Sequence, residues 1–105
     1  MQGGIYMNQL KGLPGGNRIV ITVIGPDRVG IIAAVSAILA EQRINILDIS
    51  QTIMQEFFVM VLVADMSGAV VDLNGLKEML ANKGDKLKVR IDAQHEDVFN
   101  FMHRI

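Results

Sequence analysis

The seven residues Gly25 to Ile31 (GPDRVGI) are the part of the chain best suited to bind a ligand. They join a stretch rich in β-branched residues to one with helical periodicity, so the loop leads into the start of a helix. Asp27 stands where an N-cap belongs, and its carboxylate can satisfy the amides of Val29 and Gly30 at the second and third helical positions. Amides at a helix start attract anions such as a carboxylate, and Asp27 partly opposes this because it brings a negative charge of its own.

Gly30 is the unusual residue of this loop. Inside the first turn of a helix, glycine costs about 0.5 to 1 kcal/mol relative to alanine, so its presence needs a reason. One hypothesis is that the helix packs closely on the sheet at this point. The other is that a ligand approaches the backbone, and the sequence leaves both open.

Polar side chains also follow Asn45 in the segment Ile46–Met54 (ILDISQTIM). Three of them share one face of a predicted strand: Asp48, Ser50 and Thr52. For any single one of these residues, a solvent-exposed position on an edge strand is a better explanation than contact with a ligand. Gln51 differs, because it shares its parity with apolar neighbours: Leu47, Ile49 and Ile53. Gln51 therefore points into an apolar face and needs a hydrogen-bond partner, which makes it a candidate for an interface network or a ligand contact.

The sequence carries no recognisable catalytic or metal-binding constellation. It has no cysteine, which excludes disulfides, thiolate metal sites and cysteine nucleophiles. His95 and His103 lie two helical turns apart and outside the predicted core domain, so we expect exposed tail residues rather than a metal pair. Ser36 has no histidine nearby in the sequence. We therefore predict a protein without a cofactor and without enzymatic activity.

Composition excludes further classes of protein. The 105 residues carry 10 Lys and Arg against 11 Asp and Glu, a net charge of −1, and half of them are hydrophobic, as in one small soluble domain. This charge argues against binding to nucleic acid or anionic membrane by bulk electrostatics. The longest charge-free apolar run, Val29–Ala40, is shorter than the roughly 18 residues of a membrane span, and from the composition of the first residues we expect no secretory signal. We predict a cytoplasmic protein with no membrane or direct nucleic-acid partner.

Residues 1–17 differ in composition from the rest. They hold five of the ten glycines and few side chains that a packed core can use. We predict that they form a flexible leader or an artificial extension, and that one domain spans residues 18–105.

The first half of this domain predicts a strand, a helix and a hairpin. β-branched residues predict a strand over 18–24, and an apolar stripe at helical spacing predicts a helix from about 27 to 42. Two apolar segments over 46–54 and 57–65 are separated by only two polar residues, which indicates an antiparallel hairpin.

The second half predicts a helix, a strand and a terminal helix. A helical stripe lies between Asp72 as N-cap and Gly84 as C-cap. Alternating side chains predict a half-buried strand over 87–93. Residues 95–105 form a short amphipathic helix that docks either on its own domain or on a partner subunit.

The order strand, helix, strand, strand, helix, strand is that of the ferredoxin-like βαββαβ fold. This α+β fold places two helices on one face of a four-stranded antiparallel sheet. The first and third strands are apolar at both parities and belong in the middle, which gives the spatial order 2-3-1-4. The open face of the sheet is then apolar at its centre, and monomers usually avoid such patches. We therefore predict a homodimer or a higher homo-oligomer.

At two segments the chain resembles a known family. The loop GPDRVGI (25–31), the NILDIS start of the second strand (45–50) and the βαββαβ order are similar to those of ACT domains. Residues 18–105 resemble small stand-alone ACT proteins and the ACT modules of glycine-cleavage repressors. The resemblance implies a regulatory module that binds an amino acid or another small metabolite at a dimer interface. It places Asp27 and Gly30 on one side of the ligand and Asn45 of a neighbouring chain on the other.

The predicted ligand-binding residues come from the loop and the second strand: Gly25, Asp27, Arg28, Val29, Gly30, Ile31, Asn45, Ile46, Asp48 and Gln51. Serine-binding ACT domains place a histidine where this chain has Gly25 and an asparagine where it has Asp27, so the ligand need not be serine. We predict a dimeric small-molecule sensor of the amino-acid class, with a regulated protein as a further candidate partner.

Two alternatives to a sensor stay open. An acylphosphatase-like enzyme would bind a phosphoryl group with Arg28 and orient water with Asn45, although the expected Gly-rich phosphate cradle closed by an arginine is not in the sequence. A protein-interaction module without a ligand is the other alternative. Other proteins of this fold fit less well, because RNA recognition needs stacking aromatics on the first and third strands and metal chaperones need cysteines.

Overall fold

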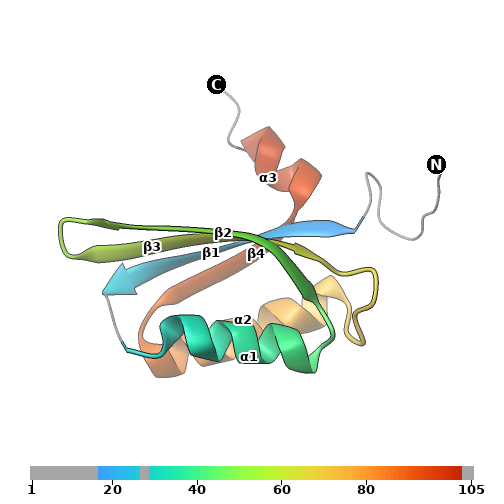
Figure 1. Ribbon diagram of the computed structural model, residues 1–105, viewed down its shortest axis with the longest axis horizontal. Helices are drawn as coiled ribbons and strands as arrows, with labels where there is room; N and C mark the ends of the chain where they lie inside the picture. The colour runs from blue at the N-terminus through green and yellow to red at the C-terminus, as the bar shows by residue number, and fades with distance from the viewer. Residues whose placement is uncertain (1–16, 27–28, 103–105) are drawn as a thin grey trace.

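One antiparallel sheet carries two helices on one face and a third helix on the other in the computed structural model, which describes residues 17–26 and 29–102 (Figure 1). The elements are β1 (Arg18–Pro26), α1 (Ile31–Glu41), β2 (Asn45–Met54), β3 (Phe57–Asp65), α2 (Leu73–Leu87), β4 (Arg90–His95) and α3 (Glu96–Met102). The strand order is β2-β3-β1-β4, so the predicted ferredoxin-like fold and its strand order are confirmed.

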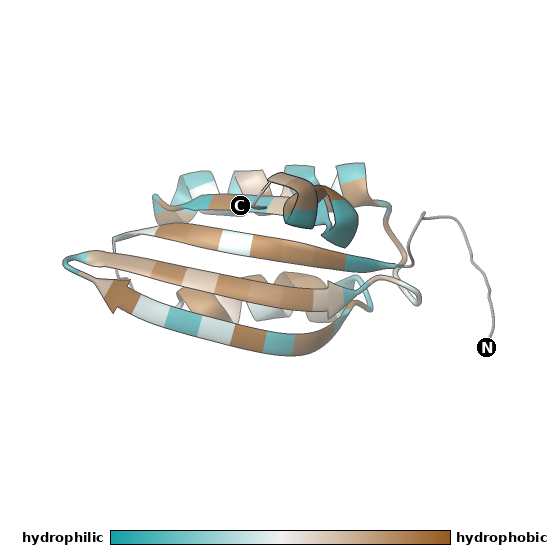
Figure 2. Ribbon diagram, turned by 90° about the horizontal axis from the view of Figure 1, so that it is seen from above, coloured by the Kyte–Doolittle hydropathy of each residue, from teal (hydrophilic) through white to brown (hydrophobic). Residues whose placement is uncertain are grey.

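Apolar side chains on both faces explain why β1 and β3 lie in the centre of the sheet. Ile21 of β1 pairs with Leu62 of β3, and both are buried under the helices. On the opposite face Val20 pairs with Val63, as expected of strands that are covered on both faces of the sheet. Figure 2 shows the hydrophobic colour running along β1 and β3, whereas β2 alternates. The core lies between this sheet and buried residues of α1 and α2: Ile31, Val35, Leu39, Leu76 and Leu80.

Asn17 marks the start of the described domain. Its carbonyl oxygen accepts a hydrogen bond from the backbone N–H of Met66 at 2.9 Å, which ties it to the end of β3. Residues 1–16 lie outside the described residues, so the predicted leader stays a prediction.

The start of α2 agrees with the prediction and its end does not. Asp72 is the N-cap, and its side chain accepts a hydrogen bond from the Gly75 N–H at 2.8 Å. The helix continues past Gly84 to Leu87, and the left-handed cap residue is Lys88 with φ 62°. The predicted C-cap at Gly84 is therefore wrong, and β4 begins later than predicted.

Close packing explains the glycine at position 84. A Cβ atom there would lie 2.7 Å from the carbonyl oxygen of Val89 and 3.3 Å from a side-chain carbon of Ile91. The side chain of Val89 also occupies the space beside Gly25, where a Cβ would lie 2.8 Å from Cγ1. The turn between α2 and β4 thus fills gaps left by two glycines.

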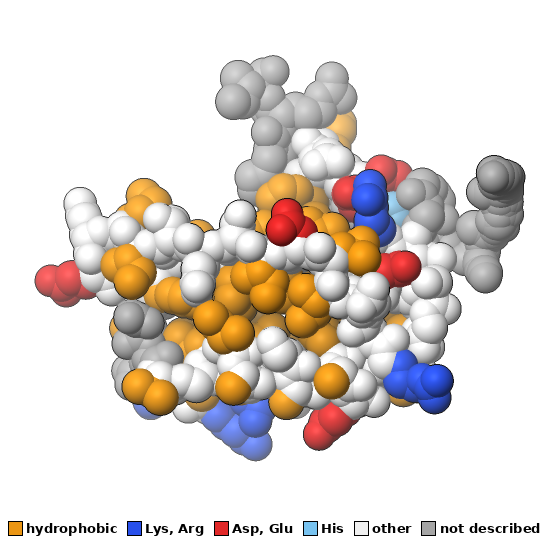
Figure 3. Space-filling view, viewed as in Figure 1, with side chains coloured by type: hydrophobic (Ala, Val, Ile, Leu, Met, Phe, Trp, Pro, Cys, Tyr) orange, Lys and Arg blue, Asp and Glu red, His pale blue; other side chains and the backbone are white. Residues whose placement is uncertain are grey.

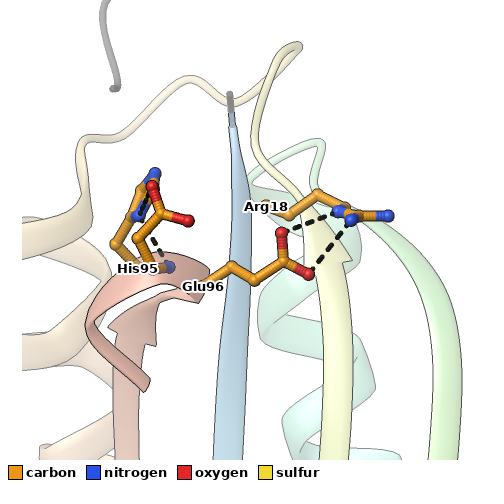
Figure 4. Close-up of polar contacts among 4 residues, drawn as sticks. Arg18, His95 and Glu96 are labelled. Atoms are coloured by element: carbon orange, nitrogen blue, oxygen red, sulfur yellow. Dashed lines mark hydrogen bonds and ion pairs between the residues drawn. The ribbon is translucent and has the colours of Figure 1, made fainter. Parts of the chain in front are cut away.

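α3 begins directly after β4 and stands on the face of the sheet opposite α1 and α2 (Figure 1). His95 is the last residue of β4 and is buried, so its predicted place in an exposed tail is wrong. Its Nδ1 atom accepts a hydrogen bond from the Asp97 backbone N–H at 3.1 Å, and Arg18 forms an ion pair with Glu96 (Figure 4). These contacts hold the first turn of α3. His103 and Ile105 lie outside the described residues.

A β-bulge interrupts the pairing of β2 with β3. Ile46 pairs with Ala64 and Asp48 with the next residue, Val63, so Leu47 is an extra residue without a partner. A bulge of this kind shifts the alternation of side chains by one position. Strict alternation, which placed Leu47 on the same face as Gln51, therefore fails at this residue.

Candidate functional site

A groove of about 750 Å³ lies between the start of α1 and the edge strand β2. Its lining residues come from α1 and the glycine before it, from β2 and from β3: Gly30, Ile31, Ile32, Ala33, Gln51, Thr52, Ile53 and Phe58. Figure 3 shows hydrophobic side chains gathered in the hollow between β2 and α1. A concave, largely apolar wall with few polar groups is typical of small-molecule sites.

Gly30 is the N-cap of α1 and has φ 90°, in the left-handed region. The helix starts at Ile31, so the predictions of Gly30 inside the first turn and of Asp27 as the N-cap are wrong. Apart from the neighbours of Gly30 in the chain, no atom of the described residues lies within 4 Å of a Cβ built on it, which contradicts close packing as the reason for the glycine. The backbone conformation requires glycine at this position, because other residues seldom adopt it.

The first turn of α1 offers backbone N–H groups to the groove. The first hydrogen bond within the helix runs from the Ala34 N–H to the Gly30 carbonyl at 2.9 Å. The amides of Ile31 to Ala33 come before it and therefore have no acceptor within the helix. Gly30 has no side chain with which to cap them, and the first turn carries no acidic residue. The helix dipole adds partial positive charge at this point. The arrangement favours a carboxylate.

Gln51 and Ile53 form the wall of the groove that faces α1. They pair with Met60 and Phe58 of β3, whose side chains point toward the helices, and cross-strand partners share a face. The prediction that Gln51 lies on the apolar face with Ile49 and Ile53 is therefore confirmed. Its side chain is nevertheless exposed, because α1 leaves the outer part of β2 uncovered. Within the single chain water can satisfy its amide, so the predicted contact of Gln51 with an interface or a ligand stays a prediction.

Of the predicted site residues, the groove brings together Gly30, Ile31 and Gln51. Gly25 is buried against Val89 and does not line the groove. Val29 is fully exposed beside it. Asp27 and Arg28 lie outside the described residues, so their predicted roles in ligand binding stay predictions.

Asn45, Ile46 and Asp48 lie at the other end of β2. Asn45 pairs with Asp65 of β3, which in turn pairs with Arg18 of β1. Ile53 pairs with Phe58 of β3, which in turn pairs with Gly25 of β1. Eight residues separate Asn45 from Ile53, a distance of about 25 Å along a strand. Within one chain the two halves of the predicted site are therefore far apart.

A family comparison identifies the domain. The family model for the ACT domain matches residues 17–94, which include all four strands up to Gln94 and both α1 and α2. The chain belongs to the ACT domain family. ACT domains are generally ligand-sensing regulatory modules, and the resemblance that the sequence suggested is thereby confirmed.

Relatives of this ACT domain occur in archaea and bacteria. A UPF0237 protein of Methanocaldococcus jannaschii is 52% identical over 89 residues, which cover 85% of this chain and 99% of that protein. The solved structure of an ACT domain protein from Streptococcus pneumoniae is 38% identical, with a TM-score of 0.71, and the match covers 80% of this chain and 94% of that one. A glycine cleavage system transcriptional repressor, described as putative, shares the fold at 20% identity and a TM-score of 0.65, over 74% of this chain and 44% of that one.

Sequence reasoning missed several residues of the ACT groove: Ile32, Ala33, Thr52, Ile53 and Phe58. Ile32 falls on the apolar stripe of α1, whose residues are expected in the core. The sequence does hold a signal for this residue, because the apolar stripe is wide enough to include two adjacent isoleucines. Two adjacent residues of a helix cannot both point at the same sheet. Ile31 is buried, and Ile32 is exposed on the groove side.

The structure describes residues 17–26 and 29–102. No helix in this part of the chain has the length and apolar character needed to cross a membrane. No group of three or more histidine or carboxylate side chains gathers there as metal ligands would.

Proposed function

We propose that this ACT domain is a non-catalytic cytoplasmic regulatory module that binds a small amino acid in the groove between α1 and β2. We further propose that a second copy of the chain completes the site along β2. The observation that carries the proposal is the groove itself, an apolar wall that begins at helical amides not capped by Gly30. The carboxylate, the ammonium group and the side chain of an amino acid would each have a matching partner there.

The carboxylate of the ligand would accept hydrogen bonds from the first-turn amides of α1, in a field made favourable by the helix dipole. The amide oxygen of Gln51 suits an ammonium group, because a carboxamide oxygen is an acceptor. The side chain of the ligand would pack on Ile53 and Phe58, which line the groove. An apolar or small amino acid fits this wall better than a charged one, whose head group would have no partner there.

A second copy would bring the missing half of the site. β2 is an edge strand of ten residues, and an exposed edge is a template for pairing with another strand. If two β2 strands pair antiparallel with Ile49 opposite Ile49 of the other copy, the end of β2 that holds Asn45 and Ile46 comes to the groove of the other copy. Ile46 pairs with Ala64 and so lies on the face of the groove, and Asn45 is the next residue along the strand. The pairing also covers the exposed apolar side chains of Ile49 and Ile53.

A thermal-shift screen with the twenty common amino acids tests the proposal. A ligand that binds only the folded state raises the melting temperature by an amount that grows with its concentration. We expect a shift with one amino acid or a few related ones, and loss of that shift in Gln51→Ala. Ser50→Ala is the matched control, because Ser50 is its neighbour on β2, is exposed and faces the other side of the sheet.

The outcomes separate the proposed sensor from the alternatives. No shift with any amino acid, in the presence of a shift with acyl phosphates or nucleotides, would favour another ligand class. No shift with any small molecule would reduce the domain to a protein-interaction module. An equal shift in Gln51→Ala and the wild type would place the ligand outside the groove.

A further inference from the structure

α3 covers only part of the open face of the sheet. It contacts β1 and β4 but neither β2 nor β3, and Figure 1 shows it standing above the sheet. An α-helix is about 10 Å wide, and neighbouring strands lie about 4.8 Å apart. One helix therefore covers about two strands, and room for a second helix remains over β2 and β3.

Both the uncovered half of this face and α3 itself carry exposed apolar side chains. At one end of β2 and β3, Met54 and Phe57 are exposed, and Val59 and Val61 behind them are only half-buried. On α3 no residue is buried, and three large apolar side chains are exposed: Val98, Phe101 and Met102. A monomer would present both apolar surfaces to water on the same side of the molecule.

Among the residues that the structure describes, the arginines beside α3 are paired within the chain. Arg18 pairs with Glu96, and Arg90 pairs with Asp92 at 2.9 Å. A two-fold interface brings each patch against a copy of the same molecule, so it needs a face without a large excess of one charge. A surface that binds a nucleic acid or a strongly acidic protein would instead present unpaired cations. The face therefore suits a second copy of this chain.

We propose that two copies pack with their open faces together, so that α3 of each copy lies over β2 and β3 of the other. The uncovered half of the sheet face measures about 10 Å by 30 Å from its strand spacing and length, and two sides of α3, which is about 10 Å long and 10 Å wide, add about 200 Å². The sum is about 500 Å² per partner, at the low end of specific interfaces. This contact uses the face opposite the groove and does not rest on the proposed pairing along β2.

Disulfide cross-linking tests where α3 docks, because the chain has no cysteine of its own. Double variants combine Phe101→Cys with Val59→Cys, Val61→Cys or Val63→Cys. Within one chain no Cα atom of α3 lies within 8 Å of a Cα atom of β3, and a disulfide needs less than about 7 Å. Oxidation is therefore expected to give covalent dimers and no internal bridge.

The matched control replaces Phe101→Cys by Val70→Cys, since Val70 is also exposed and apolar but lies in the segment between β3 and α2. The proposal requires at least one of the three pairs to form several times more covalent dimer than the control. If none does, α3 does not dock on β3 of a second copy. An internal bridge in all three pairs would show instead that α3 folds over its own β3, which also overturns the proposal.

Light scattering on two charge variants separates this interface from the proposed one along β2. Phe101→Glu introduces a charge at a side chain that is 73% exposed in the single chain, so the fold itself should not change. Ile49→Lys places like charges opposite each other in the β2 pair. With both interfaces present, we expect four copies for the wild type, two for either variant and one for the double variant.

The two proposals fail in different ways. If the wild type is a dimer, Phe101→Glu is a monomer and Ile49→Lys is unchanged, then the open-face contact stands and the β2 contact is wrong. If Phe101→Glu has the same mass as the wild type, the open-face contact is wrong whatever Ile49→Lys does. A wild-type monomer at about tens of micromolar would overturn both contacts.

Discussion

The guanidinium group of Arg18 meets the carboxylate of Glu96 with two parallel contacts, Nε to Oε1 and Nη2 to Oε2, each 3.1 Å long (Figure 4). The pair joins residues 78 positions apart in the sequence and ties the first residue of β1 to the first residue of α3. A fork-to-fork geometry fixes direction as well as distance. The pair therefore contributes to holding α3 in its orientation on the sheet.

Arg18→Gln is expected to loosen α3 without unfolding the domain. The Arg18 side chain is 55% exposed, and pairs of this kind contribute about 1 kcal/mol or less. Amide hydrogen exchange should therefore become faster in α3 and stay unchanged in β1 and β3. Arg90→Gln, which breaks the more exposed pair with Asp92 on β4, is the control and should leave exchange in α3 at the wild-type rate.

Gly30→Ala is expected to lower the free energy of unfolding by about 1 to 2 kcal/mol, because an L-residue is strained in the left-handed region. Gly30→Asn should lose less, since asparagine tolerates this conformation. Urea denaturation measures both. Equal stability of Gly30→Ala and the wild type would show that the left-handed N-cap is not required.

Gly84→Ala loses stability for a different reason. The added methyl group would lie 2.7 Å from the Val89 carbonyl oxygen, and overpacking of this kind costs about 1 to 3 kcal/mol. Alanine also improves the helix by about 1 kcal/mol, so the net loss is smaller. Gly84→Ala combined with Gly30→Ala should be additive in urea denaturation, because the two sites share no contact.

Asp72→Ala is expected to destabilise the domain by about 0.5 to 2 kcal/mol, the usual effect of losing an N-cap. Asp72→Asn should retain most of the stability, since its amide oxygen can still accept the hydrogen bond from the Gly75 N–H. Thermal unfolding of the three proteins checks the order. Equal losses in both variants would mean that charge, rather than the hydrogen bond, explains the effect.

Mixed dimers test whether the ligand site spans two chains. One chain carries Gln51→Ala and the other Asn45→Ala. If Gln51 of one copy and Asn45 of the other form each pocket, both changes fall in one pocket and the second stays intact. Calorimetry with an amino acid identified by the screen should then give one site per mixed dimer and none in either homodimer. No site in the mixed dimer would show that Gln51 of one copy and Asn45 of the other do not form a common pocket, because the two residues are too far apart to share a pocket within one chain.

The hydrophobic pattern was sufficient to predict the fold, and backbone geometry explains where it failed. The apolar strands β1 and β3 and the cap at Asp72 depend on local residue types, which the sequence displays directly. The bulge at Leu47, the helix start at Gly30 and the cap at Lys88 depend on how neighbouring elements meet. Lysine in the left-handed region is uncommon, so its residue type gave no sign of a helix end.

The candidate site was partly predictable for the same reason. Gly30 and Gln51 stood out because each conflicts with a simple pattern, a glycine at a helix start and an amide on an apolar face. Ile32 and Ile53 follow their patterns and look like core residues. Their exposure results from how far β2 extends beyond α1, a tertiary feature that no local pattern encodes.

Val89 occupies two gaps at once, with its side chain against Gly25 and its carbonyl oxygen against Gly84. The three positions belong to β1, to α2 and to the turn after α2, so they form one steric unit assembled from distant parts of the sequence. Evolution cannot change them independently. Among relatives, a side chain at position 25 should appear together with a smaller residue at position 89, so that the three positions covary although none of them lines the groove.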